Sequence, residues 1–276
     1  ARLCNALVAN ELLKKKNNKY SNTSQSKRFL LKDSPHYQGN ILEHHWHLLK
    51  NWINLDLVLK NNFRYPRNPP KRSKREIAAF ILGMKNRTIE GARDFLKHIN
   101  LSWARNMLDL GGGPAAYSIT FAKKYKNLKA TVLDLPEVIP ITKNEIKMAN
   151  ATSVTAKVGN ILAGNYGQNF DLVFISNIIH SFDLATNLKI FQHSLLAMAP
   201  KGKIMVKDFY VNESRSGPYF PVMFSINMLM GTPDGDTYTV GEIKKLLQQV
   251  GFVKIKVVDV GQDSQVIMGE KPGQSP

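Results

Sequence analysis

The chain has 276 residues, 43% of them hydrophobic, which fits one large domain or two modest ones with a packed core. No apolar run reaches the roughly 18 residues that a membrane-spanning helix needs. Cys4 is the only cysteine, so an internal disulfide is excluded and a reducing compartment is expected. We therefore predict a cytoplasmic protein without a signal peptide or a membrane span.

The net charge of +17 is distributed unevenly along the chain. Residues 1–105 contain 21 Lys+Arg and 7 Asp+Glu, a net of +14, and the remaining residues contribute only +3. Such asymmetry can mark a protein that binds nucleic acid or a membrane surface. We favour the plainer explanation, a solvated basic face, because a basic patch alone is only an electrostatic footprint.

The first third of the chain predicts helices joined by polar segments. Residues 1–16 place apolar side chains on one helical face, and the polar stretch Lys14–Ser26 then predicts a hairpin, an order that suits a winged-helix unit. Residues 39–60 again show helical spacing. Residues 61–75 hold three prolines and six Lys/Arg, which predicts a linker, and residues 76–100 predict one or two further helices.

From Asn106 onward short apolar strands alternate with helices, which predicts a parallel sheet covered on both faces. The last two strands, 253–260 and 265–269, are separated by only four residues, and so short a connection requires antiparallel pairing. The strands expected before them are 107–110, 130–133, 154–158, 172–176 and 204–209, and the helices are 115–125, 137–149, 188–198 and 240–250.

The strongest motif is NMLDLGGGPAA over residues 106–116, in which a buried strand runs into three glycines and then a helix. Glycine permits positive φ and lets the backbone approach a ligand closely. Pro114 suits the first turn of the following helix. Because such a turn presents free N–H groups at the carboxyl edge of the sheet, the motif predicts a nucleotide-type cofactor site.

Two cofactors compete for this loop. Gly111, Gly113 and Ala116 fit the fingerprint of dinucleotide sites, and Asp134 would bind ribose hydroxyls. S-adenosylmethionine, however, also contains an adenosine. Asp109 separates the two, because a carboxylate at this strand end suits the ammonium group of S-adenosylmethionine and would repel a pyrophosphate. We predict the methyl donor, with a dinucleotide or a tight turn without a ligand as the alternatives.

These segments resemble one enzyme family. LDLGGGPAAYSITFAKKYKNLKATVLDLPEV is similar to the small-molecule O-methyltransferases typified by the hydroxyindole and caffeic acid enzymes and by bacterial antibiotic and carotenoid O-methyltransferases. FDLVFISNIIHSFD, APKGKIMVKDF and FSINMLMGTPDGDTYTVGEIKKLLQQVGF follow in the family's order, and RFLLKDSPHYQGN resembles the end of its dimerisation domain. The resemblance covers nearly the whole chain.

The resemblance implies an α/β fold in which residues 99–276 form a class I methyltransferase domain with a Rossmann-like sheet. Residues 1–98 would form a mainly α, winged-helix-like dimerisation region, so a homodimer is implied. Relative to the family, the chain begins inside the winged helix, and one or two upstream helices are expected to be missing.

The family's cofactor residues map onto positions at the ends of the predicted strands. Two of them depart from its pattern: Ala115 stands where glycine is usual, and Asn160 where aspartate is usual, although an amide oxygen can still accept from an adenine amino group. The implied contacts are Asp109, Gly111 and Gly113 at the methionine end, Asp134 and Leu135 at the ribose, Asn160 and Ile161 at the adenine, and Ser176 as a further contact.

Methyl transfer from a sulfonium needs alignment of the acceptor with the methyl group and removal of the acceptor's proton. His180 follows the predicted strand 172–176 and matches the family's catalytic base in IIHSFD. Asp208, at the end of the strand 204–209, matches the acidic residue that would orient the imidazole. The alternatives are that His180 is a core or surface histidine without a catalytic role, and that Asp208 only caps the turn after its strand.

Thr237 stands where plant members of the family have a second supporting glutamate, with Asp234 and Asp236 nearby. This departure leaves a different activity open, because a few members of this fold family bind the cofactor but catalyse hydroxylation or decarboxylation instead. Asn227 is the best acceptor contact, because a polar residue among Met and Leu needs a hydrogen-bond partner. The other acceptor candidates, which could equally be core, are Phe182, Met223, Phe224, Met228 and Met230.

Two further clusters carry weaker hypotheses. His44 and His47 could share a helix face, but no second ligand cluster accompanies them, so we predict no metal. The run Lys71–Arg75 could contact phosphates, which makes a nucleic-acid-binding protein or nucleic-acid methyltransferase the second hypothesis. Against it, the tetrapeptide of amino-methylating enzymes is absent, and residues 176–179 read Ser-Asn-Ile-Ile.

Overall fold

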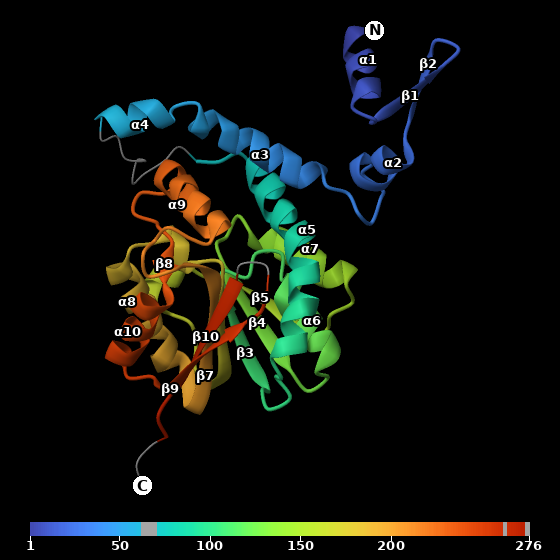
Figure 1. The fold of residues 1–276 in the computed structure, drawn as a ribbon. Helices are drawn as coiled ribbons and strands as arrows, with labels where there is room; N and C mark the ends of the chain where they lie inside the picture. Colours follow the sequence, from blue (N-terminus) through green and yellow to red (C-terminus); the bar gives the residue numbers. More distant parts are fainter. Residues whose placement is uncertain (62–70, 262–263, 274–276) are drawn as a thin grey trace.

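A mainly parallel sheet forms the centre of the carboxyl-terminal two thirds of the chain (Figure 1). The computed structural model describes residues 1–61, 71–261 and 264–273. The strand order is β5-β4-β3-β6-β7-β10-β9, with β8 paired to β7. The strands are β3 Asn106–Leu110, β4 Lys129–Asp134, β5 Val154–Val158, β6 Phe170–Ser176, β7 Met198–Val211, β8 Tyr238–Thr239, β9 Val253–Asp259 and β10 Ser264–Glu270.

Strands β3 to β7 run parallel, whereas β10 is antiparallel to both β7 and β9. The predicted Rossmann-like fold and the antiparallel closing pair are therefore confirmed. The helices and 3-10 turns that connect these strands are α6 Ala116–Lys124, α7 Ile139–Met148, η1 Ile161–Ala163, η2 Ile179–Ser181, α8 Leu184–Ala197, α9 Tyr219–Gly231 and α10 Val240–Val250.

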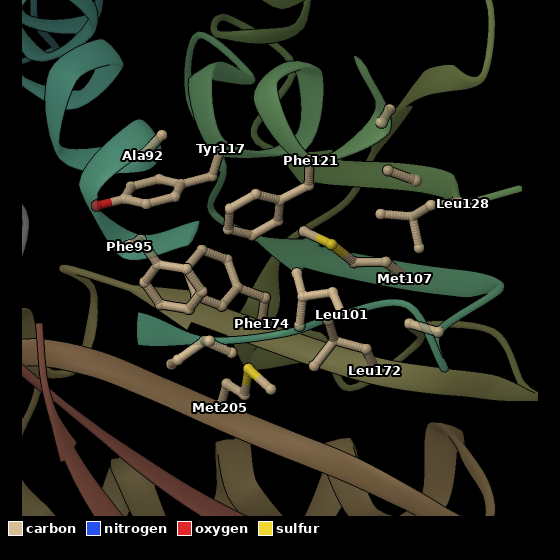
Figure 2. Packing of buried hydrophobic residues seen from close by; sticks show 14 of the residues in the cluster. Ala92, Phe95, Leu101, Met107, Tyr117, Phe121, Leu128, Leu172, Phe174 and Met205 are labelled. Atoms are coloured by element: carbon tan, nitrogen blue, oxygen red, sulfur yellow. The ribbon is translucent and has the colours of Figure 1, made fainter. Parts of the chain in front are cut away.

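Two hydrophobic cores cover the two faces of the sheet. One joins α5 Lys74–His98 and α6 to the strands and is rich in aromatic rings: Phe95, Tyr117, Phe121 and Phe174 pack together with centroids 5.1–5.9 Å apart (Figure 2). The other packs α8 and α10 on the opposite face, with Phe191 and Leu247 fully buried. Burial on both faces explains why these strands are continuous apolar runs rather than alternating patterns.

The amino-terminal part contains α1 Arg2–Ala9, β1 Leu13–Lys16, β2 Lys19–Asn22 and α2 Ser24–Leu30, a unit that stands away from the sheet (Figure 1). The helix predicted over residues 1–16 is wrong beyond Ala9. There the chain turns through Glu11, whose φ is +58°, and Leu13 enters the hairpin instead. The polar hairpin is confirmed, and Asn17 and Asn18 form its turn with positive φ, a conformation that asparagine tolerates.

Helices α3 Gly39–Trp52 and α4 Leu55–Asn61 confirm the helical spacing of residues 39–60. Most of the predicted linker lies outside the described residues. The next helix, α5 Lys74–His98, is one continuous helix whose start is fixed by a capping box between Ser73 and Glu76. It packs on α3 and α6, so it connects the amino-terminal helices to the sheet. Among the described residues, no helix is long and apolar enough to cross a membrane.

Candidate active site

The glycine loop after β3 adopts the conformation that the motif requires. Gly111 and Gly113 have φ of +66° and +51°, in the left-handed region. A Cβ at Gly111 would lie 2.5 Å from the side chain of Ile178, and one at Gly112 would lie 2.6 Å from the carboxyl group of Asp109. Ala115 also has a positive φ, +60°, a conformation that glycine adopts at less cost, which agrees with the expectation of a glycine at this position.

Two carboxylates stabilise this loop. Asp134 ends β4 and accepts hydrogen bonds from the backbone N–H groups of Gly113 at 2.8 Å and Leu135 at 2.7 Å. Asp109 is buried and accepts a hydrogen bond from the Ser118 hydroxyl at 2.6 Å. Burial raises the pKa of Asp109 to about 7, and burial also raises the pKa of Asp134. Because burial is the main cause of both pKa shifts, both carboxyl groups lie where there is little water.

The remaining expected cofactor residues follow the carboxyl ends of neighbouring strands. Asn160 follows β5 and uses its side-chain oxygen to cap η1 at the Leu162 N–H, 2.9 Å away. That oxygen keeps a second lone pair for another donor. Ile161 accepts a hydrogen bond from Tyr166 through its carbonyl oxygen. Ser176 ends β6, so the parallel topology brings these residues to the edge that carries the glycine loop.

His180 and Asp208 form a buried pair at the same edge. His180 lies in η2, directly after β6, and Asp208 lies near the end of the neighbouring strand β7. The distance between His180 Nδ1 and Asp208 Oδ1 is 2.7 Å, and the exposed fractions of the two residues are 9% and 1%. A carboxylate at Nδ1 fixes the tautomer with the proton on that nitrogen, which leaves Nε2 able to accept a proton.

The carboxylate of Asp208 has no second acidic neighbour in the position expected from plant enzymes. Thr237 is buried, and within the described residues its hydroxyl and the Asp208 Oδ2 atom both lack a hydrogen-bond partner. Asp236 instead pairs with Arg215 at 3.3 Å. The orientation of His180 therefore depends on Asp208, and on the close packing of Gly235, where a Cβ would overlap the His180 carbonyl oxygen.

Aromatic rings surround the imidazole of His180. Phe224 of α9 approaches it edge-on at 4.9 Å, and Phe209 of β7 lies parallel to it at 6.5 Å. Phe220 completes the group by packing on Phe209 at 4.9 Å. Phe209 and Phe220 were not predicted as site residues. Phe209 follows Asp208 directly, and an aromatic residue beside a strand-end acid is the signal that could have indicated it.

The predicted acceptor residues separate into two groups. Asn227 accepts a hydrogen bond from the indole N–H of Trp52 at 3.1 Å, which joins α3 to α9 over the site. Met223 and Phe182 are half-buried, whereas Met228 and Met230 of α9 are buried. Trp52 was missed because 175 residues separate it from Asn227 in the sequence.

The two weaker clusters have structural partners. His44 packs on Phe80 at 5.0 Å, and burial lowers its pKa to about 4, while His47 faces Glu76 at 3.6 Å. Among the described residues, no group of three or more potential ligands could hold a metal ion. In the basic run, Arg75 pairs with Glu43 at 2.5 Å.

The strand order, the glycine loop with its acids and the buried His–Asp pair together define a class I methyltransferase. The family model of the O-methyltransferase domain matches residues 46–253, so the chain belongs to this family. The predicted family and enzyme class are thereby confirmed: the chain is a small-molecule O-methyltransferase that depends on S-adenosylmethionine. The positive-φ glycines and the strand-end acids fit that methyl donor.

Similar proteins support this assignment, and a solved structure supports the fold. The chain is 27% identical over 265 residues to 3-hydroxy-5-methyl-1-naphthoate 3-O-methyltransferase of Streptomyces sahachiroi, covering 93% of this chain and 76% of that one. It is also 27% identical over 269 residues to acetylserotonin O-methyltransferase of Gallus gallus, covering 91% and 76%. The human N-acetylserotonin methyltransferase structure in complex with SAM superposes with a TM-score of 0.84 at 24% identity, covering 98% and 82%.

Proposed function

We propose that this enzyme transfers the methyl group to a hydroxyl of a small aromatic or polyketide-like acceptor, with His180 as general base. The observation that carries the proposal is the 2.7 Å contact between His180 and Asp208 beside the rings of Phe209 and Phe224. A flat acceptor suits such rings, since aromatic groups pack well against one another. The names of similar proteins, which include a naphthoate and an acetylserotonin enzyme, support this acceptor class.

The donor supplies an electrophilic methyl group on a sulfonium. The residues of the chain have two tasks, to hold the acceptor oxygen in line and to remove its proton. Nε2 of His180 takes the proton from the acceptor hydroxyl. Asp208 stabilises the imidazolium that forms, because its carboxylate already accepts from Nδ1. Asn227, held by Trp52, offers a polar contact that orients the acceptor.

The cofactor contacts expected from the sequence belong to the same proposal. The positive-φ turns of Gly111 and Gly113, which carry no side chain, let the methionine end approach the loop backbone closely. Asp134 would exchange its loop hydrogen bonds for ribose hydroxyls, with Leu135 beside the ribose and Asn160 and Ile161 at the adenine. Asp109 would attract the ammonium group, and Ser176 would provide a further contact.

The test is methyl transfer to a panel of phenolic acceptors by the unaltered enzyme and by His180→Gln. The variant should lose about 100-fold or more in kcat, because a positioned base contributes on that order. Its affinity for S-adenosylhomocysteine should stay unchanged. His98→Gln, at the exposed end of α5, is the matched control. A His180→Gln enzyme with full turnover on every acceptor would remove the proposed base.

We further propose that residues 1–98 form a dimerisation region and that the enzyme is a cytoplasmic homodimer. Helix α3 and its C-cap residue Ile53 support this, because the apolar side chains at positions 42, 46, 49 and 53 are exposed and lie on one helical face. An exposed apolar stripe of this kind marks a protein-interaction surface. The single cysteine supports a reducing compartment.

A further inference from the structure

A lysine lies buried beneath the active-site edge of the sheet. Lys207 is 8% exposed, and among the described residues it is the only buried lysine or arginine. It stands next to Asp208 on β7 and is the direct parallel partner of Ser176 on β6. Side chains of directly paired strand residues project from the same face of a sheet, so Lys207 lies beside the position expected to contact the cofactor.

The ammonium group of Lys207 belongs to a hydrogen-bond network with the turn after β6. It donates to Asn177 Oδ1 at 3.1 Å and to Ser264 at 3.2 Å, and Ser176 donates to the same Asn177 oxygen at 3.2 Å. Two donors on one amide oxygen fix which end of the Asn177 side chain is the oxygen. The other end, Nδ2, is buried and has no hydrogen-bond partner among the described residues.

The ring of Tyr117 links this network to the glycine loop. Lys207 Nζ lies 5.9 Å from its centroid. Burial raises the pKa of the Tyr117 hydroxyl, and a hydrogen bond with Ser176 opposes this shift. The turn after β6 also meets the glycine loop directly, since a Cβ at Gly111 would lie 2.5 Å from the side chain of Ile178. The buried ammonium and the Asn177 amide are therefore on the side of the site where the methionine end of the donor is expected.

Charge complementarity indicates what these groups bind. The donor carries a sulfonium, an ammonium and one carboxylate. Asp109 and Asp134 suit the positive groups, but they disfavour the carboxylate unless a cation lies close to it. A cationic ammonium beside an amide N–H that lacks a partner is a suitable carboxylate subsite.

We propose that Lys207 and Asn177 bind the α-carboxylate of the methionine end of the donor and so position its methyl group. This subsite does not depend on the acceptor proposed above.

The test compares two ligands that differ only in the carboxylate: S-adenosylhomocysteine and its decarboxylated analogue, S-adenosyl-3-thiopropylamine. Isothermal titration of the unaltered enzyme should show roughly 10- to 100-fold weaker binding of the analogue, the range expected for a charge-assisted hydrogen bond. In Lys207→Gln, the affinity for S-adenosylhomocysteine should fall to that of the analogue. The affinity for the analogue should stay within about twofold of its value in the unaltered enzyme. Lys203→Gln, on the same strand, is the matched control and should behave like the unaltered enzyme.

Asn177→Asp gives a second test if Lys207→Gln does not fold. Aspartate tolerates the positive φ of +57° at this turn, but it replaces the amide donor with a negative charge. The affinity for S-adenosylhomocysteine should therefore fall much more than the affinity for the analogue. Equal binding of both ligands by the unaltered enzyme, or an unchanged ratio of their affinities in a folded variant, would overturn the proposal and leave Lys207 with a purely structural role.

Discussion

Asp208 is the acid that we propose orients His180, since Thr237 stands where a second supporting acid is expected. We predict that Asp208→Asn lowers kcat by about 100-fold or more, since an amide can hold the imidazole in the wrong tautomer. Binding of S-adenosylhomocysteine, measured by titration calorimetry, should not change. Asp259→Asn, on the exposed strand β9, is the control, and equal kcat values in the two variants would contradict the pairing.

Asp109 makes the stability of the cofactor-free enzyme depend on pH. Burial raises its pKa from 3.8 to about 7, against the hydrogen bond from Ser118 and together with the charge of Asp134. Between these two pKa values the folded chain keeps a proton that the unfolded chain has released. Stability therefore falls as the pH rises through this window, and the loss is complete above the folded pKa.

We predict that the melting temperature of the unaltered enzyme, relative to Asp109→Asn, falls between pH 5 and about pH 7.5. The asparagine cannot ionise but can still accept from Ser118, so the difference between the two curves isolates Asp109. Thermal unfolding followed by circular dichroism across this range measures it. Parallel curves would show that Asp109 is ionised throughout.

At the scale of elements, α5 connects the amino-terminal helices to the cofactor loop. It packs on α3 and α6, and the side chain of Ile81 lies 3.8 Å from where a Cβ would stand on Gly113. The ion pair between Lys85 and the buried Glu145 joins α5 to α7. This pair therefore holds α5 over the loop, and its loss should loosen that wall of the site.

We predict that Glu145→Gln lowers the free energy of unfolding by about 1–3 kcal/mol, the range for charge-assisted hydrogen bonds with a buried partner. Urea denaturation measures the change. Asp94→Asn is the matched control, because its pair with Lys97 also lies on α5 but is exposed, and exposed pairs contribute about 1 kcal/mol or less. A loss no larger than that of the control would show that the pair does not hold α5.

At the scale of the whole molecule, we propose that the exposed apolar face of α3 forms the dimer interface. We predict that the unaltered enzyme is a dimer and that Trp46→Glu combined with Ile53→Glu makes it monomeric, because two charges would enter an apolar interface. Sedimentation velocity at micromolar concentration measures the mass. Leu196→Glu changes an equally exposed residue on α8 and should leave the dimer intact. A monomeric unaltered enzyme would exclude the dimer.

Much of the carboxyl-terminal fold could be predicted because it rests on local signals. The strand Val154–Val158 and the helix Val240–Val250 have the predicted bounds, since period and capping residues act within one element. Strand-end residues such as Asp134 and His180 were predicted to share an edge because parallel strands present their carboxyl ends together. The predicted amino-terminal helix was too long because a turn with positive φ at Glu11 has no strong sequence signal.

The sequence by itself therefore determined the class of fold, the glycine loop and the residue types that carry the chemistry. Only the tertiary structure decided which side chains meet across long separations: Trp52 with Asn227, Phe220 with Phe209, Gly235 with His180, and Lys207 with the turn at Asn177. Such contacts depend on how helices pack and on which strands are neighbours. No local period or propensity encodes either, because both follow from the burial of apolar surface over the whole chain.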